Sequence, residues 1–330
     1  MKILRSRAIF MMKKPFRIWS LLLCTLTSVS LGQNLSRVEA QTQPGQVQRD
    51  VVYGEVEGQK LLLDVYGANP AVTRPAIIFV HGGSWSSGSK SDLGFAASAL
   101  AWQGYVGFSI DYRLLRDGKN RFPTQIDDAQ RAVRWVRAHA AEYGVDPQKI
   151  GALGASAGGH LVALLGTTDT RDNSDPALSA YSSRVQCVVD LYGPADFTPA
   201  LEPANREKIA NDNSEGAQIL QKFLGPLPEA ADNYRAASPI THIDSKTAPF
   251  LIFHGGKDTL VPLDQSQRLD AALHKEGIES KLVVFPEAGH GYREPELLRQ
   301  TLEGAVEFFN RHLKSPAAEP KTERQAHGLP

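Results

Sequence analysis

The stretch from Lys149 to His160, "KIGALGASAGGH", places Ser156 among small residues, with glycines two positions before and two positions after it. Glycine weakens a strand, and each glycine inside a helix costs about 1 kcal/mol relative to alanine. A sharp turn from a strand into a helix does use glycines at these positions, because they let the backbone fold tightly and leave the serine hydroxyl exposed. The stretch therefore predicts a strand at 149–154, a turn at Ser156 and a helix at 157–165.

Strand-like and helical patterns alternate on both sides of this turn. Residues 51–66 are typical of a β-hairpin with its turn near 57–59. Six short apolar runs predict further strands, and the intervals between them show helical periodicity. The fold class is therefore α/β: a mostly parallel eight-stranded sheet with an N-terminal antiparallel hairpin and helices on both faces. The six strands are expected at 75–80, 105–110, 149–154, 185–192, 249–255 and 281–287, and the helices at 91–102, 124–143, 157–165, 264–276 and 294–313.

Residues 1–40 are typical of a signal peptide. Basic residues at 13, 14 and 17 precede the apolar run 18–31, which is short for a membrane span, and Val38-Glu39-Ala40 offers a cleavage site. We therefore expect a secreted or periplasmic protein that is free of the membrane after cleavage. An uncleaved membrane anchor, acylation at Cys24 and a start at Met11 or Met12 stay open as alternatives.

The remainder predicts one domain at 51–314, after a polar linker at 41–50 and before a disordered tail at 315–330. The polar, Pro-rich segment 196–244 interrupts the alternation and is predicted to be a cap-like insertion over the sheet. Lys+Arg 36 and Asp+Glu 36 give a net charge of zero, which argues against nucleic acid as a partner. Cys187 lies in an apolar run and is expected to be a buried structural thiol.

Polar residues follow several of the expected strands, where the carboxyl edge of an α/β sheet collects functional groups. Ser156, Asp258 and His290 follow three different strands and could serve as nucleophile, orienting acid and general base. Asp264 is a rival to Asp258, but we favour it as the cap of the helix near Gln265. No pair of His or Cys residues shows the spacing of metal ligands, so no metal and no cofactor is expected.

A serine nucleophile also needs donors for the developing oxyanion. Ala157, at the start of the helix after the turn, can offer a backbone N–H group, and so can the loop "HGGSW" at 81–85 through Gly82 and Gly83. His81 is expected to hold this loop by hydrogen bonds. Four aromatic residues next to these motifs could line a substrate pocket or could be packing residues: Trp85, Tyr112, Phe197 and Tyr292.

Six motifs, in this order, resemble those of the α/β-hydrolase esterases: "HGGSW" (81–85), "DYRL" (111–114), "GASAGGHL" (154–161), "YGPADF" (192–197), "HGGKDTLVP" (254–262) and "AGHGY" (288–292). The resemblance covers about 50–313 and is to the group related to hormone-sensitive lipase and to BD-FAE-type feruloyl and acetyl esterases. It implies an α/β-hydrolase fold, a catalytic triad of Ser156, Asp258 and His290, and oxyanion donors at Gly82, Gly83 and Ala157. Two positions differ from the family pattern: Ser84 replaces a third glycine, and the turn reads GASAG instead of GDSAG.

The sequence thus predicts a serine carboxylic-ester hydrolase that acts through an acyl-enzyme on small soluble esters, such as short-chain acyl, feruloyl or acetylated-sugar esters. Its partner is expected to be this small-molecule substrate, and its oligomeric state is not predicted. A peptidase of the prolyl-oligopeptidase kind, an arylformamidase and a non-catalytic hydrolase-like binding protein are the alternatives.

Overall fold

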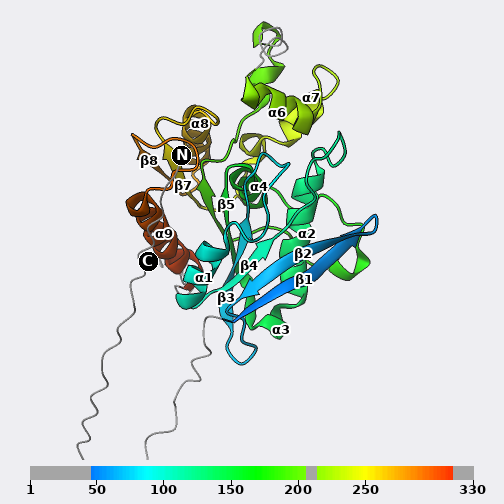
Figure 1. Cartoon of the computed structure of the whole chain (residues 1–330), viewed down its shortest axis with the longest axis vertical. Helices are drawn as coiled ribbons and strands as arrows, with labels where there is room; N and C mark the ends of the chain where they lie inside the picture. Colours follow the sequence, from blue (N-terminus) through cyan, green and yellow to red (C-terminus); the bar gives the residue numbers. More distant parts are fainter. Residues whose placement is uncertain (1–45, 206–213, 315–330) are drawn as a thin grey trace, which may run out of the picture. The chain divides into compact units, whose positions relative to one another are not determined.

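Eight strands form one sheet in the computed structural model, which describes residues 46–205 and 214–314 (Figure 1). Their order is β1-β2-β4-β3-β5-β6-β7-β8. β2 pairs antiparallel with both β1 and β4, and every other neighbouring pair is parallel. The predicted eight-stranded sheet with its antiparallel hairpin is confirmed. The strands are β1 (Val47–Val56), β2 (Gln59–Tyr66), β3 (Arg74–Val80), β4 (Val106–Ile110), β5 (Val145–Ala155), β6 (Cys187–Leu191), β7 (Phe250–Gly255) and β8 (Ser280–Phe285).

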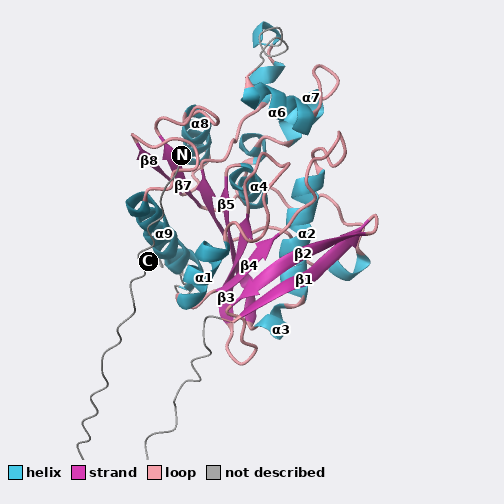
Figure 2. Cartoon of the chain, viewed as in Figure 1, coloured by secondary structure: helices cyan, strands magenta, loops and turns pink. Residues whose placement is uncertain are grey.

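Helices follow most of the strands, as the alternation predicted (Figure 2). The α-helices are α1 (Gly94–Trp102), α2 (Thr124–Ala138), α3 (Ala140–Tyr143), α4 (Ala157–Thr167), α6 (Glu215–Leu224), α7 (Ala231–Ala236), α8 (Asp264–Lys275) and α9 (Pro295–Phe309). Short helical turns are η1 (Pro176–Leu178), η2 (Thr198–Leu201), η3 (Pro239–His242) and η4 (Asn310–Lys314).

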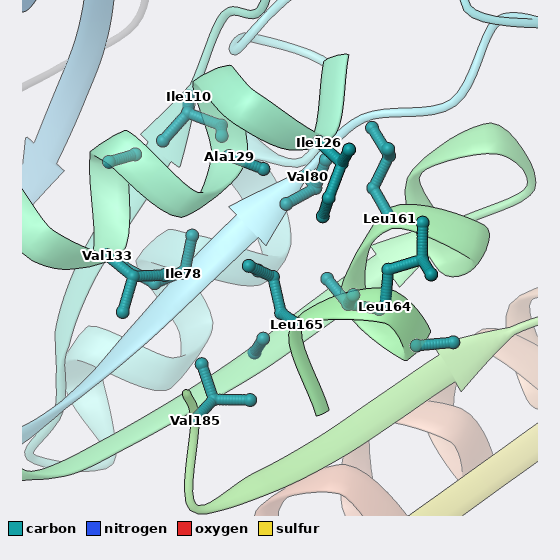
Figure 3. Packing of buried hydrophobic residues seen from close by; sticks show 14 of the residues in the cluster. Ile78, Val80, Ile110, Ile126, Ala129, Val133, Leu161, Leu164, Leu165 and Val185 are labelled. Carbon is teal, nitrogen blue, oxygen red and sulfur yellow. The ribbon is translucent and has the colours of Figure 1, made fainter. Parts of the chain in front are cut away.

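Helices pack on both faces of the sheet. Successive side chains of a strand point to opposite faces, so one strand contributes to both hydrophobic clusters. In β3, Ile78 and Val80 belong to the hydrophobic cluster that includes α2 and α4, and Figure 3 shows this packing. Ile77 and Phe79 belong instead to the cluster that includes α1 and α9. Strands that are apolar on both faces read as continuous apolar runs, which is why the sequence revealed them.

At two places an element differs from the one predicted by more than the position of its ends. β1 begins at Val47, so 47–50 are part of the hairpin and not of a linker; Val47 pairs with Tyr66, and the backbone N–H of Asp50 donates to Asp64. The helix predicted at 124–143 ends at Ala138 and a short α3 follows, because His139 leaves helical geometry and stacks on Trp135. Cys187 is a buried free thiol in β6, as expected.

Some predicted segments lie outside the described residues, namely the signal peptide at 1–40 and the tail at 315–330. Of the cap-like insertion, 196–205 and 214–244 are described and contain η2, α6, α7 and η3. Within the two described ranges, none of the helices combines the length and the apolarity that crossing a membrane requires.

Candidate active site

Ser156 occupies a tight turn between β5 and α4, with φ 54° and ψ −119°. A side chain at either flanking glycine would collide with backbone. A Cβ at Gly154 would lie 2.2 Å from the Gly158 carbonyl oxygen, and a Cβ at Gly158 would lie 2.0 Å from the Val80 carbonyl oxygen. Glycine is therefore required at both positions, and the serine is left at the apex of the turn, which is the arrangement that the opening stretch of sequence predicted.

A chain of hydrogen bonds joins Ser156, His290 and Asp258. His290 Nε2 lies 2.9 Å from Ser156 Oγ, and His290 Nδ1 lies 2.7 Å from Asp258 Oδ2. The three residues follow β5, β8 and β7, so the structure brings together the side chains that the sequence placed at three strand ends. A base positioned on a hydroxyl and oriented by a carboxylate is the geometry of an activated serine nucleophile.

Asp258 is held in its ionised form. Burial on its own raises the pKa of this carboxyl group, but hydrogen bonds from His254, His290 and the Val261 N–H outweigh it and lower the pKa. His290 contacts Asp258 Oδ2, and the second oxygen, Oδ1, accepts the N–H groups of Leu260 and Val261, at 3.0 and 2.9 Å. An ionised, immobile carboxylate can stabilise the imidazolium that forms when His290 takes a proton.

His254 is a neighbour of Asp258 to which the sequence analysis gave no role. Its Nε2 lies 3.4 Å from Asp258 Oδ2 and 2.9 Å from the Val261 carbonyl oxygen, and its Nδ1 lies 2.7 Å from Ser266 Oγ. The side chain is fully buried. Its position four residues before Asp258, at the end of β7, was the available signal.

Asp264 is neither in the hydrogen-bonded chain nor a helix cap. α8 begins at Asp264 itself, and the residue before the helix, Leu263, has no side-chain cap. The Asp264 carboxylate instead pairs with Arg268 one turn later, at 2.6 Å. This corrects the predicted capping role, because Asp264 is the first residue of the helix and not the residue before it.

The loop after β3 lies against the serine turn. A Cβ at Gly82 would lie 3.3 Å from Ser156 Cβ, and Gly83 has φ 108°, a conformation that favours glycine. Among the described residues, the backbone N–H groups of Gly82, Gly83 and Ala157 have no protein acceptor. These donors are therefore available to an anionic oxygen beside Ser156.

His81 and Tyr112 hold this loop in place by stacking and hydrogen bonds. Tyr112 stacks on His81 with ring centroids 4.3 Å apart, and its hydroxyl donates to the His81 carbonyl oxygen at 3.1 Å. His81 Nδ1 lies 2.7 Å from the Gly82 carbonyl oxygen, and burial lowers the pKa of the ring. Both side chains position the loop.

A cavity of about 250 Å³ opens beside Ser156. Trp85 and Phe197 line it, together with apolar side chains of α6 such as Ile219 and Leu220. Tyr112 and Tyr292 do not line it, which corrects their candidacy as pocket residues: Tyr112 packs on His81, and the Tyr292 hydroxyl bonds with Thr301 at 2.7 Å. Four polar residues also line the cavity and were not predicted to do so: Ser84, Asp196, Gln265 and Arg268.

Trp85 is fixed in the cavity wall by His160. The indole Nε1–H donates to His160 Nδ1 at 3.2 Å, so the imidazole carries its proton on Nε2, which donates to the Ala237 carbonyl oxygen at 2.7 Å. Burial lowers the pKa of His160 to about 4 and keeps the ring neutral. Trp85 also stacks on Phe223 of α6, with centroids 3.9 Å apart. The wall therefore links the loop after β3, α4 and the cap-like insertion.

Comparison with known proteins places these features in a family. The family model described as BD-FAE matches residues 63–273. Esterase LipC of Mycobacterium tuberculosis is 36% identical over 252 residues, which are 74% of this chain and 59% of LipC. The probable carboxylic ester hydrolase LipM of the same organism is 34% identical over 244 residues, 72% of this chain and 54% of LipM. The chain thus spans little more than half the length of these two relatives.

Among solved structures, a propionate-bound esterase, Est2, from Thermogutta terrifontis is similar to this chain. The two are 31% identical, with a TM-score of 0.69 over 84% of this chain and 98% of that one. The likeness therefore includes nearly all of the solved chain.

Proposed function

The chain belongs to the BD-FAE family, and from this premise and the geometry at Ser156 we propose that it is a serine carboxylic-ester hydrolase. The observation that carries the proposal is the continuous chain from Ser156 through His290 to Asp258, with contacts of 2.9 and 2.7 Å. The names of the two mycobacterial relatives and of the solved structure, all esterases or ester hydrolases, support the same activity. A non-catalytic binding protein would not need this alignment.

In the proposed mechanism, Ser156 Oγ attacks the ester carbonyl carbon while His290 Nε2 takes the hydroxyl proton. The carbonyl oxygen becomes an oxyanion, which the N–H groups of the 82–83 loop and of Ala157 can stabilise. His290 then passes the proton to the leaving alcohol, and an acyl group stays on Ser156. Water, deprotonated by His290, attacks this acyl-enzyme and releases the carboxylic acid, which restores the serine.

The first experiment combines covalent labelling with kinetics. A fluorophosphonate probe should label the purified chain at Ser156, and Ser156→Ala should abolish labelling and reduce p-nitrophenyl acetate turnover by 10⁴-fold or more, on the order seen for other triad serines. Ser245→Ala, at an exposed serine before β7, is the matched control and should keep both properties. Labelling that survives Ser156→Ala would place the nucleophile elsewhere, and faster turnover of aminoacyl p-nitroanilides than of esters would favour the peptidase alternative.

The finer proposal is that the substrates are small, soluble esters, with short acyl chains or with substituted aromatic or sugar groups. Its support is the size of the cavity, about 250 Å³, and the mixture of apolar and polar side chains in its wall. A hydrolysis panel that compares acyl chain lengths with feruloyl and acetylated-sugar esters tests it. A maximum at long chains would contradict it.

We also propose that the protein is exported, on the strength of the basic residues, the apolar run 18–31 and the Val38-Glu39-Ala40 site. Expression of the full sequence in a bacterium that secretes proteins, followed by mass determination of the exported product, tests this. A product that begins at Gln41 supports cleavage, and full-length protein in the cytoplasm contradicts export.

A further inference from the structure

Gln265, the second residue of α8, presents a fixed hydrogen-bonding group to the cavity beside Ser156. Its Oε1 accepts the backbone N–H groups of Ala195 and Asp196, at 3.0 and 2.8 Å. Only the oxygen of a carboxamide can accept, so these two donors determine which way the group is turned. The NH₂ group must lie on the other side.

That NH₂ group has no acceptor among the residues that the structure describes, and it is not one of their buried, unpartnered polar atoms. Gln265 is partly exposed. The carboxylate of Asp196, which also lines the cavity, accepts from Thr198 and pairs with Arg268, and within the described residues no hydrogen bond joins it to the Gln265 NH₂ group. The amide nitrogen is therefore a donor that a molecule in the cavity can use.

The charges next to Gln265 restrict what kind of group can use this donor. Arg268, also in the wall, is already paired with two carboxylates: Asp196 at 3.3 Å and Asp264 at 2.6 Å. Two negative charges thus surround one positive charge, and a further anion would be repelled. A neutral acceptor oxygen matches the donor without this penalty.

We propose that Gln265 is a specificity-determining residue that selects esters carrying a neutral acceptor oxygen, such as an ether, carbonyl or hydroxyl oxygen, on the part that occupies the cavity. The inference rests on the proposed ester hydrolysis and adds a substrate class to it. An apolar body would lie against Trp85, Phe197 and Ile219, and its oxygen would accept from the Gln265 NH₂ group.

The test uses matched substrate pairs in which an ether oxygen replaces one methylene. One series consists of p-nitrophenyl esters of methoxyalkanoic acids and of the equally long alkanoic acids, with the oxygen moved along the chain. A second series consists of acetates of methoxyalkanols and alkanols, because either part of the ester could enter the cavity. The measured quantity is the ratio of kcat/KM for the ether to kcat/KM for the alkyl partner.

The decisive variant is Gln265→Glu, because a glutamate can still accept from Ala195 and Asp196 but has no N–H group to donate. Gln267→Glu makes the same change on an exposed position of α8 and is the matched control. At one oxygen position the ratio should fall about 5- to 10-fold in Gln265→Glu, as expected for one hydrogen bond to a neutral acceptor, and should stay unchanged in Gln267→Glu.

Both members of a pair are measured on the same protein. A partial loss of folded enzyme therefore lowers both apparent kcat/KM values equally and leaves their ratio unchanged. Equal ratios in the wild type and in Gln265→Glu at every oxygen position of both series would overturn the inference while leaving the ester hydrolase intact. A wild type that hydrolyses neither member of any pair would overturn the proposed function itself.

Discussion

The two glycines that flank Ser156 have no room for a side chain, because backbone atoms of α4 and β3 lie against them. The positive φ of Ser156 is a conformation that residues with a side chain seldom adopt, and the surrounding contacts must hold it in place. The carbonyl group of Val80, from β3, occupies the space that a Cβ at Gly158 would need. The strained backbone of Ser156, its reacting hydroxyl and the two closely packed glycines thus lie within residues 154–158.

We predict that Gly158→Ala lowers the free energy of unfolding by about 3 kcal/mol or more, since overpacking of this kind displaces backbone. Gly216→Ala is the comparison, because its Cβ would have the Leu260 carbonyl oxygen as nearest neighbour, at 3.7 Å. That change should alter stability by no more than about 1 kcal/mol. Urea denaturation of both variants measures the difference, and equal stabilities would contradict it.

The two aspartates near His290 should differ sharply in their effect on rate. Asp258→Asn removes the carboxylate that orients Nδ1 and favours the wrong imidazole tautomer, so kcat should fall about 10⁴-fold. Asp264→Asn removes only a partly exposed pair with Arg268, and kcat for p-nitrophenyl acetate should change by less than about 3-fold. Steady-state kinetics that rank the two variants in the opposite order would reject the assignment of Asp258.

At the scale of elements, α4 is joined to the loop after β3 and to the residue that follows α7, Ala237, through one neutral histidine, His160. Its folded pKa of about 4 is below the ordinary value of 6.5, so the unfolded chain binds this proton at a higher pH than the folded chain does. The contribution of His160 to stability is therefore complete above about pH 6.5 and is lost as the pH falls toward 4.

We predict that the stability difference between the wild type and His160→Phe narrows by about 2 kcal/mol from pH 7 to pH 5. The comparison with a variant is needed because Asp190 also titrates in part of this range. Burial raises its pKa to about 6, so its contribution to stability falls as the pH rises, opposite to that of His160. Urea denaturation at the two pH values measures both proteins. A constant difference would mean that His160 is not buried as a neutral ring.

α6 contributes Ile219 and Leu220 to the wall of the cavity beside Ser156, and much of the segment around these two residues is polar. A lid that binds an oil surface would need a broad exposed apolar face. We therefore predict falling kcat/KM from butyrate to palmitate and no increase in rate above the solubility limit of the substrate. An increase at that limit would show that the segment meets lipid.

The whole molecule shows which features a sequence can and cannot reveal. The buried strands were visible because both of their faces are apolar, and Ser156, Asp258 and His290 could be grouped because each follows a parallel strand. The packing of Tyr112 on His81 and the Gln265 contacts could not be predicted, because each joins residues that are distant in sequence and local patterns do not encode such packing. His254, four residues before Asp258 at the end of β7, could have been grouped with it.

A substitution outside the active site should lower the stability of the whole molecule without changing its activity. Arg134 is buried in α2 and donates to carbonyl groups at Asp172, Leu178 and Tyr181 in the connection between α4 and β6. Arg134→Met leaves these groups without their donor, and the free energy of unfolding should fall by about 3 kcal/mol. The value of kcat/KM at 25 °C should stay within about 2-fold; a matching loss of kcat/KM in folded protein would show that the arginine also supports the site.

The serine and its base are 134 residues apart in the chain, and His290 follows the last strand, which pairs only with β7 within the described sheet. A chain that has folded only as far as Asp258 has its nucleophile and its acid but no base. Ester hydrolysis therefore requires β8 to have docked on β7, so that His290 can reach Ser156. During refolding, the first turnover should report that this strand is in place.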